Sequence, residues 1–354
     1  AELYEQNEQP DQALATFNRI LEKNPEVSVA YVKQAFLLIQ LHRTDDAFTL
    51  LNKGHATLPE DLPILEMLGY VHAAMTNHTE AVACLAKVEA QLQESGKKPL
   101  MSNFYLNYAI SLQQLDRTDE AAAMVRKAMT DDPDALNDYL AIVLRSPDRR
   151  DKLQRSLQVL ELLTDMVPDT APSRTMYGLI AFQSEAYEIA LDQLEQAEQI
   201  LLREESDEDL TAQFYFWLGA SAERIKQFER SETYFLRAIQ LEPDHAESHN
   251  YLAYMLAERG EKLEMAYDHI GVALAIDPEN AAYLDTRGWI YYRQGNYDSA
   301  LADIQSALAV LPDDPTITDH LGDVYQALGN ETEARLWWQK SLEIDPDNKA
   351  VRTK

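Results

Sequence analysis

Apolar and small residues recur along the chain three and four positions apart, which is the spacing of one face of an α-helix. In residues 281–314 a first stripe contains Leu284, Gly288 and Tyr291, and a second contains Tyr297, Ala300, Ile304 and Ala307. Gly295 lies between the stripes, and glycine ends helices because it adopts the left-handed conformation without strain. This pattern predicts two antiparallel helices joined by a short turn.

The unit recurs along the chain with a period close to 34 residues. Eight of the 14 prolines mark it, at positions 25, 59, 133, 168, 243, 278, 312 and 346. Each proline closes a unit because it cannot continue the second helix. One helix pair cannot bury its apolar face alone, so neighbouring pairs must stack. We therefore predict an all-α fold, an α-solenoid of about ten antiparallel helix pairs.

The repeated unit resembles the tetratricopeptide repeat (TPR). Residues 315–348 carry the pattern as Leu321, Gly322, Tyr325, Gly329, Ala334, Trp338 and Pro346, and residues 212–245 as Tyr215, Leu218, Gly219, Phe228, Phe235, Ala238 and Pro243. The resemblance covers nearly the whole chain. It implies a right-handed superhelix with first helices on its concave side, and a non-enzymatic scaffold that binds a protein or peptide.

Irregular units suggest three segments of one continuous solenoid: 1–135, 136–211 and 212–354. The first unit lacks most of its first helix. It is therefore either a degenerate capping repeat or part of a repeat in a longer protein of which this sequence is a fragment. Extra residues at 93–99 and 203–209 are expected to lengthen two second helices and then loop out. Ser146-Pro147 is expected to end a first helix about a turn early. The following helix, near Asp148–Val167, should be correspondingly long.

The charge of the chain narrows the classes of partner. Acidic residues number 60 and basic residues 31, which gives a net charge of −29. A polyanion is repelled by phosphate backbones and by anionic membrane surfaces, so we expect neither as a partner. No apolar stretch is long enough to span a bilayer. Residues 1–20 show no signal peptide, and a lipid anchor upstream of this sequence remains open.

Motifs for catalysis or cofactor binding are missing from the sequence. It has no glycine-rich phosphate loop, HExxH, CxxC pair or nucleophile elbow. We therefore expect no catalytic residues, no cofactor and no metal. His245 and His249 are four residues apart but have no third ligand, so surface histidines are favoured over a zinc site. Cys84 is interpreted as a small buried hydrophobic residue. The acidic run from Glu204 to Asp209 is interpreted as a solvated extension rather than a calcium loop.

Helical geometry suggests where a partner would bind. In each first helix, repeat positions 2, 5, 9, 12 and 13 should face the concave groove. This places Val32, Phe36 and Gln40 there, and also Asp319 and Asp323. Aromatic residues and arginine anchor protein interfaces, and on that ground the proposed partner-binding residues are Asn250, Tyr254, Asp285, Trp289, Tyr292, Arg293, Phe216 and Arg224.

Two alternatives remain open for Trp289. If its ring faces solvent, Trp289→Ala should weaken partner binding and change stability little. If the ring packs on the neighbouring repeat, the replacement should mainly cost stability, with Tyr291→Ala as the core control.

A basic cluster interrupts the acidic chain in the irregular unit. It contains Arg145, Arg149, Arg150, Lys152 and Arg155. These residues either form ion pairs within the protein or provide a docking point for an acidic partner segment.

The last three repeats show a narrower resemblance. The sequences NYLAYMLAERGEKLEMA, AYLDTRGWIYYRQGNYDSA and HLGDVYQALGNETEA are similar to the ends of Gram-negative bacterial TPR lipoproteins. This resemblance implies a bacterial scaffold on the periplasmic side of the outer membrane that recruits a protease or an envelope-assembly partner. A cytoplasmic location is the alternative. The alternative function is an interaction segment of a larger enzyme or secretion component. The partner and the oligomeric state remain open.

Overall fold

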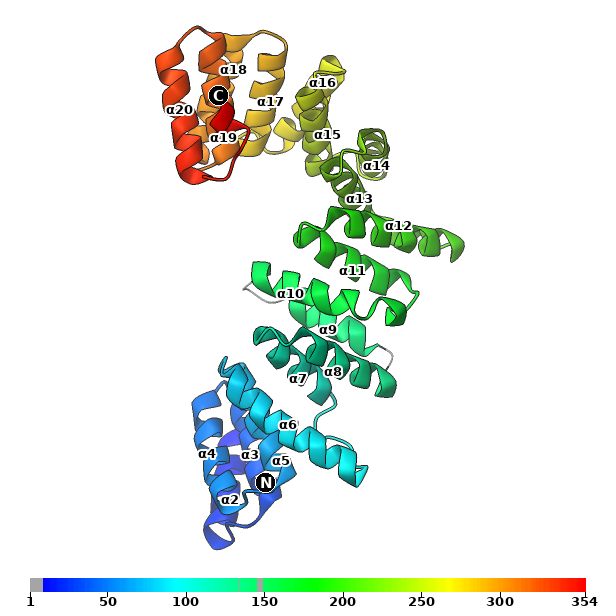
Figure 1. Ribbon diagram of the computed structural model, residues 1–354, viewed down its shortest axis with the longest axis vertical. Coiled ribbons are helices and arrows are strands. Elements are labelled where there is room, and N and C mark those ends of the chain that lie inside the picture. Colours follow the sequence, from blue (N-terminus) through cyan, green and yellow to red (C-terminus); the bar gives the residue numbers. More distant parts are fainter. Residues whose placement is uncertain (1–8, 133, 145–148) are drawn as a thin grey trace. The chain divides into compact units, whose positions relative to one another are not determined.

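The computed structural model describes residues 9–132, 134–144 and 149–354. Within these ranges the protein consists of α-helices α2 to α20 and three short 3-10 helices, without a strand (Figure 1). The prediction of an all-α repeat fold is therefore confirmed. Within each compact unit successive helices pair, for example α3 with α4 and α5 with α6 in the first unit, and α13 with α14 and α17 with α18 in the second. No helix in the described part of the chain is both long and apolar enough to cross a membrane.

The contacts divide the chain into two compact units. The first comprises Ala1–Ser184. Its helices are α2 (Pro10–Lys23), α3 (Ser28–Gln40), α4 (Thr44–Thr57), α5 (Leu62–Ala74), α6 (His78–Ser95), α7 (Phe104–Gln114), α8 (Thr118–Asp131), α9 (Ala135–Leu144), α10 (Arg149–Glu161) and α11 (Ala171–Gln183), with η1 (Thr164–Met166) after α10. Within this unit each second helix packs on the first helix of the next pair.

The second unit comprises Glu185–Lys354. Its helices are α12 (Tyr187–Arg203), α13 (Ala212–Arg224), α14 (Phe228–Leu241), α15 (Ala246–Arg259), α16 (Leu263–Ile276), α17 (Ala281–Arg293), α18 (Tyr297–Val310), α19 (Pro315–Ala327) and α20 (Glu331–Ile344), with η2 (Asp207–Asp209) and η3 (Val351–Thr353). The three segments expected from the sequence, with boundaries after residues 135 and 211, stay a prediction.

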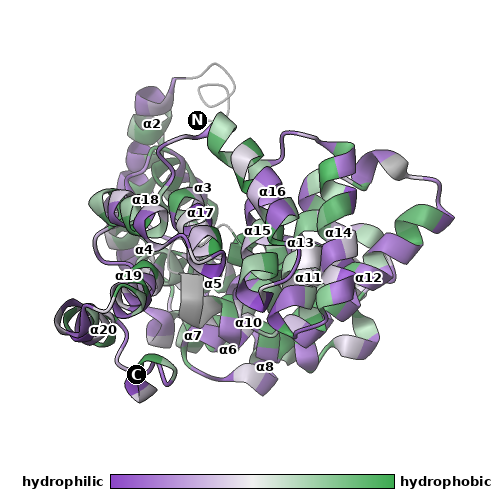
Figure 2. Ribbon diagram, turned by 90° about the horizontal axis from the view of Figure 1, so that it is seen from above, coloured by the Kyte–Doolittle hydropathy of each residue, from purple (hydrophilic) through white to green (hydrophobic). Residues whose placement is uncertain are grey.

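Each helix carries both hydrophobic and hydrophilic residues (Figure 2), and the buried core consists mainly of its apolar residues. The glycine in the middle of a first helix allows this packing. A Cβ atom added to Gly288 would lie 2.6 Å from Cγ1 of Ile304 on α18. At Gly219 the same atom would lie 2.7 Å from the ring of Phe235. Gly288 therefore allows α17 and α18 to approach closely.

A residue with positive φ lies in the turn between the two helices of a pair. Gly295 has a φ of 80° and Gly329 one of 78°, so the predicted left-handed conformation of Gly295 is confirmed. Other turns use residues with a side chain, among them Thr76 with a φ of 60° and Asp116 with a φ of 58°. L-residues adopt this conformation at a cost, and the repeat geometry therefore strains these turns.

The two insertions lengthen second helices as expected. Helices α6 and α12 contain 18 and 17 residues, whereas α4, α8 and α14 contain 14. After α12 the chain continues through a turn and η2.

The prediction of a long helix near Asp148–Val167 was wrong. Helix α10 ends at Glu161, and a 3-10 turn follows. The hydroxyl of Thr164 donates to the carbonyl oxygen of Glu161 at 2.8 Å, and the guanidinium of Arg126 donates to the carbonyl oxygen of Leu162. These bonds satisfy the last carbonyls of the helix and end it early. Helix α9 ends at Leu144; Ser146-Pro147 itself lies outside the described residues.

Candidate functional site

Three rings from two first helices form an aromatic stack in the second unit. Trp289 on α17 lies between Tyr292 on the same helix and His320 on α19. Its ring centroid is 4.5 Å from that of Tyr292 and 4.0 Å from that of His320, with interplanar angles of 9° and 10°. Trp289 is only 6% exposed. The ring therefore packs on the neighbouring repeat and does not face solvent, which is the second alternative that the sequence left open.

A buried acid–base pair supports the stack. Nδ1 of His320 lies 3.0 Å from both carboxylate oxygens of Asp285, and both side chains are buried. Burial alone would lower the pKa of His320, but the charge of Asp285 and the hydrogen bond to it raise this pKa above its usual range. Asp285 thus orients His320 through Nδ1–H, and the His320 ring packs against the Trp289 ring.

Asn250 and Tyr254 extend this cluster to α15. The ring of Tyr254 lies 6.3 Å from that of His320. Burial, with the nearby carboxylates of Glu258 and Asp285, raises the pKa of Tyr254. Asn250 is buried, and its Oδ1 has no hydrogen-bond partner within the described part of the chain; the same holds for Nε1 of Trp289. Each of these atoms could bond to the backbone of a partner only after local movement, because neither is accessible here.

The remaining predicted residues lie in different environments. Phe216 is buried, with its ring edge-on to Tyr251 at 5.0 Å, so it belongs to the packing between α13 and α15. Arg224 is exposed, and its Cζ lies 5.8 Å from the Tyr187 ring centroid. Arg293 is exposed and donates from Nη1 to the carbonyl oxygen of Glu258 at 3.0 Å. The structure thus brings Tyr254, Asp285, Trp289 and Tyr292 together, with Asn250 one turn before Tyr254 on α15. Arg224 is close enough to Tyr254 for its charge to oppose the raised pKa of that residue, and Phe216 belongs to a different packing contact. The partner-binding role of all these residues stays a prediction.

A lysine ammonium group occupies an acidic site on α19. Nζ of Lys354 lies 2.7 Å from Oδ1 of Asp319, and 2.7 and 2.8 Å from the two oxygens of Asp323. Nε1 of Trp338 on α20 donates to Asp323 at 3.0 Å, and its ring centroid lies 5.7 Å from Nζ. We call Asp319, Asp323 and Trp338 the ammonium site.

The ammonium site adjoins the aromatic stack. Burial is the main reason why the pKa of Tyr292 is raised. The charge of Asp323 raises this pKa further, and the charge of Lys354 partly offsets the increase. Burial also raises the pKa of Asp319, with Asp323 adding to it and Lys354 opposing it. These mutual effects show that Tyr292 of the stack lies near Asp323 and Lys354.

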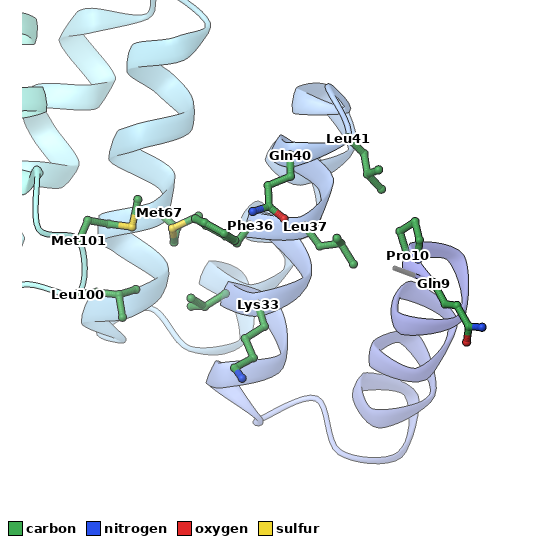
Figure 3. A pocket seen from close by; sticks show the side chains of 11 residues that line it. Gln9, Pro10, Lys33, Phe36, Leu37, Gln40, Leu41, Met67, Leu100 and Met101 are labelled. Carbon is green, nitrogen blue, oxygen red and sulfur yellow. The ribbon is translucent and has the colours of Figure 1, made fainter. Parts of the chain in front are cut away.

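The first unit carries an apolar pocket of about 710 Å³. Its wall is formed by Pro10, Val32, Phe36, Leu37, Met67, Leu100 and Met101, with the polar residues Gln9, Lys33 and Gln40 at the same pocket. Phe36 on α3 and Met67 on α5 point toward one another, and Leu100 and Met101 lie beside them (Figure 3). Phe36 is 45% and Leu100 50% exposed. We call this the Phe36 pocket.

A buried carboxylate holds one wall of the Phe36 pocket. The side chain of Glu66 on α5 accepts hydrogen bonds from the backbone N–H groups of Leu100, at 2.8 Å, and Met101, at 2.6 Å. Burial raises the pKa of Glu66, and these two hydrogen bonds partly counteract the increase. Glu66 therefore fixes the loop before α7 against the first-helix surface.

Of the basic cluster predicted from the sequence, the structure describes the side chain of Arg155. Arg145 and the side chains of Arg149, Arg150 and Lys152 lie outside the described residues. Arg155 is bound within the protein: Nε lies 3.0 Å from Asp116, and Nη1 donates to the carbonyl oxygen of Gln114 at 3.1 Å. Arg155 thus caps the end of α7, which agrees with internal ion pairing for this residue.

His245 and His249 are buried, so the expectation that they are surface histidines was wrong. His245 caps α15 by accepting from the Ser248 N–H at 3.3 Å. The Nδ1 atoms of His249 and His269 lie 2.9 Å apart. Within the described residues no three His, Cys, Asp or Glu side chains form a metal-binding group. Burial raises the pKa of the half-buried Cys84 thiol, which lowers its reactivity.

Sequence reasoning missed several residues of these surfaces. His320 and Lys354 were not recognised, because their hydrogen bonds reach residues 31 to 35 positions away in the sequence. Met67, Leu100 and Met101 were missed because the rule used for groove positions covers neither core positions nor loops. The rule did name Phe36 and Asp319, which lie on first helices and are exposed and partly exposed; their position in a concave groove stays a prediction.

Comparison with known proteins identifies the family. The family described as "Psidin, N-terminal TPR repeats region" matches residues 3–231. A second family, "Tetratricopeptide repeat", matches residues 218–281 and 286–349. The chain belongs to the tetratricopeptide repeat family. TPR domains generally mediate protein–protein interactions, and TPR proteins are typically non-enzymatic scaffolds.

One curated relative is the TPR repeat-containing protein PA4667 of Pseudomonas aeruginosa, which is 29% identical over 170 residues. The match covers 46% of this chain and 27% of that protein, so the chain spans about a quarter of the relative's length.

The chain is also similar to several solved structures. TTC0263, a thermophilic TPR protein of Thermus thermophilus, has a TM-score of 0.44 and 22% identity, covering 52% of this chain and 95% of its own. MamA from Desulfovibrio magneticus RS-1 has a TM-score of 0.41 and 16% identity over 51% and 97%. The APC/C hetero-tetramer Cut9-Hcn1 has a TM-score of 0.47 and 14% identity over 99% and 81%.

Proposed function

We propose that the protein is a non-enzymatic scaffold that binds a partner protein on the first-helix surfaces of its TPR units. The observation that carries this proposal is the Phe36 pocket, in which Phe36 and Leu100 remain 45% and 50% exposed. Apolar pockets with few polar groups at their edge are typical binding sites. In the second unit, Tyr254, Tyr292 and Arg293 provide a further surface, while Asn250, Asp285 and Trp289 support it from within.

Capture of partners from extracts of the source cells tests this proposal. The bait is the full chain, compared with Phe36→Asp and with Leu336→Asp as control. Leu336 on α20 is also 45% exposed but lies outside the pocket. We expect specific proteins to be lost with Phe36→Asp and retained with Leu336→Asp. If Phe36→Asp captures the same proteins as the unmodified chain, the proposal is wrong.

We propose further that this scaffold works on the periplasmic side of a bacterial outer membrane and recruits a protease or an envelope-assembly partner. Support comes from the resemblance of its last three repeats to TPR lipoproteins and from the match to a Pseudomonas aeruginosa protein. Fractionation of source cells tests the location. Recovery with the outer membrane is expected, and recovery only in the cytoplasmic fraction would argue for the alternative location.

A second candidate is an interaction segment of a larger enzyme or secretion component. It is favoured by the observation that the match covers only 27% of the curated relative. The complete gene distinguishes the two candidates: a second folded domain supports this one, and a lipoprotein signal supports the scaffold. The net charge of −29 supports proteins rather than nucleic acids as partners in both cases.

A further inference from the structure

We propose that the ammonium site, Asp319, Asp323 and Trp338, binds a lysine side chain of a partner protein, and that Lys354 occupies it as an internal competitor. This inference rests on the proposed scaffold function and specifies the chemistry of one contact.

The three short contacts fit a primary ammonium group. An ammonium has three N–H donors, and three oxygens lie 2.7 to 2.8 Å from Nζ: one of Asp319 and both of Asp323. The planar guanidinium of arginine directs its donors in one plane and cannot place three of them at one point. The ring of Trp338 closes one side of the site at 5.7 Å from Nζ and adds attraction for a cation. The site therefore favours lysine.

The charge of the site favours a cation. The side chains of Asp319 and Asp323 are only 17% exposed. Two carboxylates bound to the same nitrogen lie close enough to repel each other, and burial and this repulsion raise the pKa of Asp319. With Lys354 bound, two negative charges still face one positive charge. Removing Lys354 leaves both carboxylates uncompensated, which favours either another cation at the site or protonation of one carboxyl group.

Lys354 is held by few contacts of its own segment. In η3 only Val351 is buried, at 2% exposure, while Arg352 and Thr353 are exposed. A segment anchored by one valine and one ammonium group can be displaced by a partner segment that offers the same two groups. The adjoining Tyr292 ring and the acidic surface around it favour such a basic segment over an acidic one.

Peptide binding by a variant with a weakened segment tests the inference. Val351→Ser with Lys354→Met removes both anchors. The probe is a fluorescein-labelled peptide with the sequence of residues 348–354, and its matched controls carry norleucine or arginine in place of the last lysine. Fluorescence anisotropy gives each Kd, and circular dichroism verifies that the variant is folded.

We expect the double variant to bind the lysine peptide about tenfold or more tightly than the norleucine and arginine peptides, the range of a charge-assisted hydrogen bond. The unmodified chain should bind the lysine peptide about tenfold more weakly than the double variant, because Lys354 competes. Adding Asp319→Asn and Asp323→Asn should abolish the preference for lysine.

Equal affinities for the lysine and norleucine peptides, or for the double variant and the unmodified chain, would overturn the inference. A preference for lysine that persists without both aspartates would overturn it as well. These results would leave the scaffold proposal intact, because partner capture through Phe36 is measured separately in the other unit.

Discussion

The rings of Trp289 and His320 stack at a centroid distance of 4.0 Å with an interplanar angle of 10°. Trp289 belongs to one repeat and His320 to the next, so this contact joins two repeats on their first-helix side. Asp285 holds His320 in place. The contact makes the proposed partner surface of the second unit depend on a buried, titratable pair.

We expect Trp289→Ala to lower the free energy of unfolding by about 3–5 kcal/mol, the range for removing a large aromatic side chain from a core. Tyr291→Ala should cost less, because Tyr291 is only partly buried. Urea denaturation measures both losses. A Trp289→Ala protein as stable as the unmodified chain would contradict the burial of this ring.

The Asp285–His320 pair predicts a pH dependence of stability. The pKa of His320 is raised in the folded protein, so its stabilising contribution is complete below the unfolded pKa of about 6.5. The contribution is lost as pH rises through the higher folded pKa. Besides Asp285, the carboxylates of Glu258 and Asp319 contribute to this shift.

The test compares unfolding free energies of the unmodified chain and His320→Gln between pH 6 and pH 9. Glutamine can donate a hydrogen bond to Asp285 but does not titrate. The advantage of the unmodified chain should shrink as pH rises. An advantage that is constant or grows with pH would contradict a raised pKa of His320.

We predict that replacing Thr76, in the turn between α5 and α6, by glycine stabilises the protein. The φ of 60° at Thr76 costs an L-residue about 1–2 kcal/mol, and glycine loses about 0.4–1 kcal/mol through the entropy of the unfolded chain. Thr76→Gly should therefore stabilise the protein by about 0.5–1 kcal/mol in thermal or urea unfolding. The reverse change, Gly329→Ala at a φ of 78°, should destabilise it. If Thr76→Gly is destabilising, the left-handed turn is not strained.

We predict that the side chain of Glu66 stabilises the loop that forms one wall of the Phe36 pocket. Glu66→Gln replaces one acceptor oxygen by an N–H₂ group that faces a backbone N–H, so one of the two bonds to Leu100 and Met101 is lost. We expect a loss of about 1–3 kcal/mol and faster hydrogen exchange of these two amides. Glu60→Gln, at an exposed position, should change neither. Unchanged exchange in Glu66→Gln would show that this carboxylate does not hold the loop.

The sequence predicted the helix pairs because their apolar stripes recur with a fixed period, and several pairs also carry a turn glycine or a closing proline. It also placed Phe36, Asp319 and Asp323 on the first-helix surface, since that side of a helix follows from spacing alone. It could not predict that Trp289 is buried, because the His320 that covers it lies 31 residues away, in the next repeat. The end of α10 at Glu161 depends on a bond from Arg126 of an earlier repeat, which local propensity does not reveal.

Site-specific photocrosslinking in the source cells tests the central claim most directly. A benzoylphenylalanine placed at position 36 would lie in the Phe36 pocket, and one at position 336 would lie on an equally exposed part of α20. If the first-helix surface binds a partner protein, position 36 should give a discrete crosslinked product with another protein and position 336 should not. The same products from both positions, or none from position 36, would contradict the account.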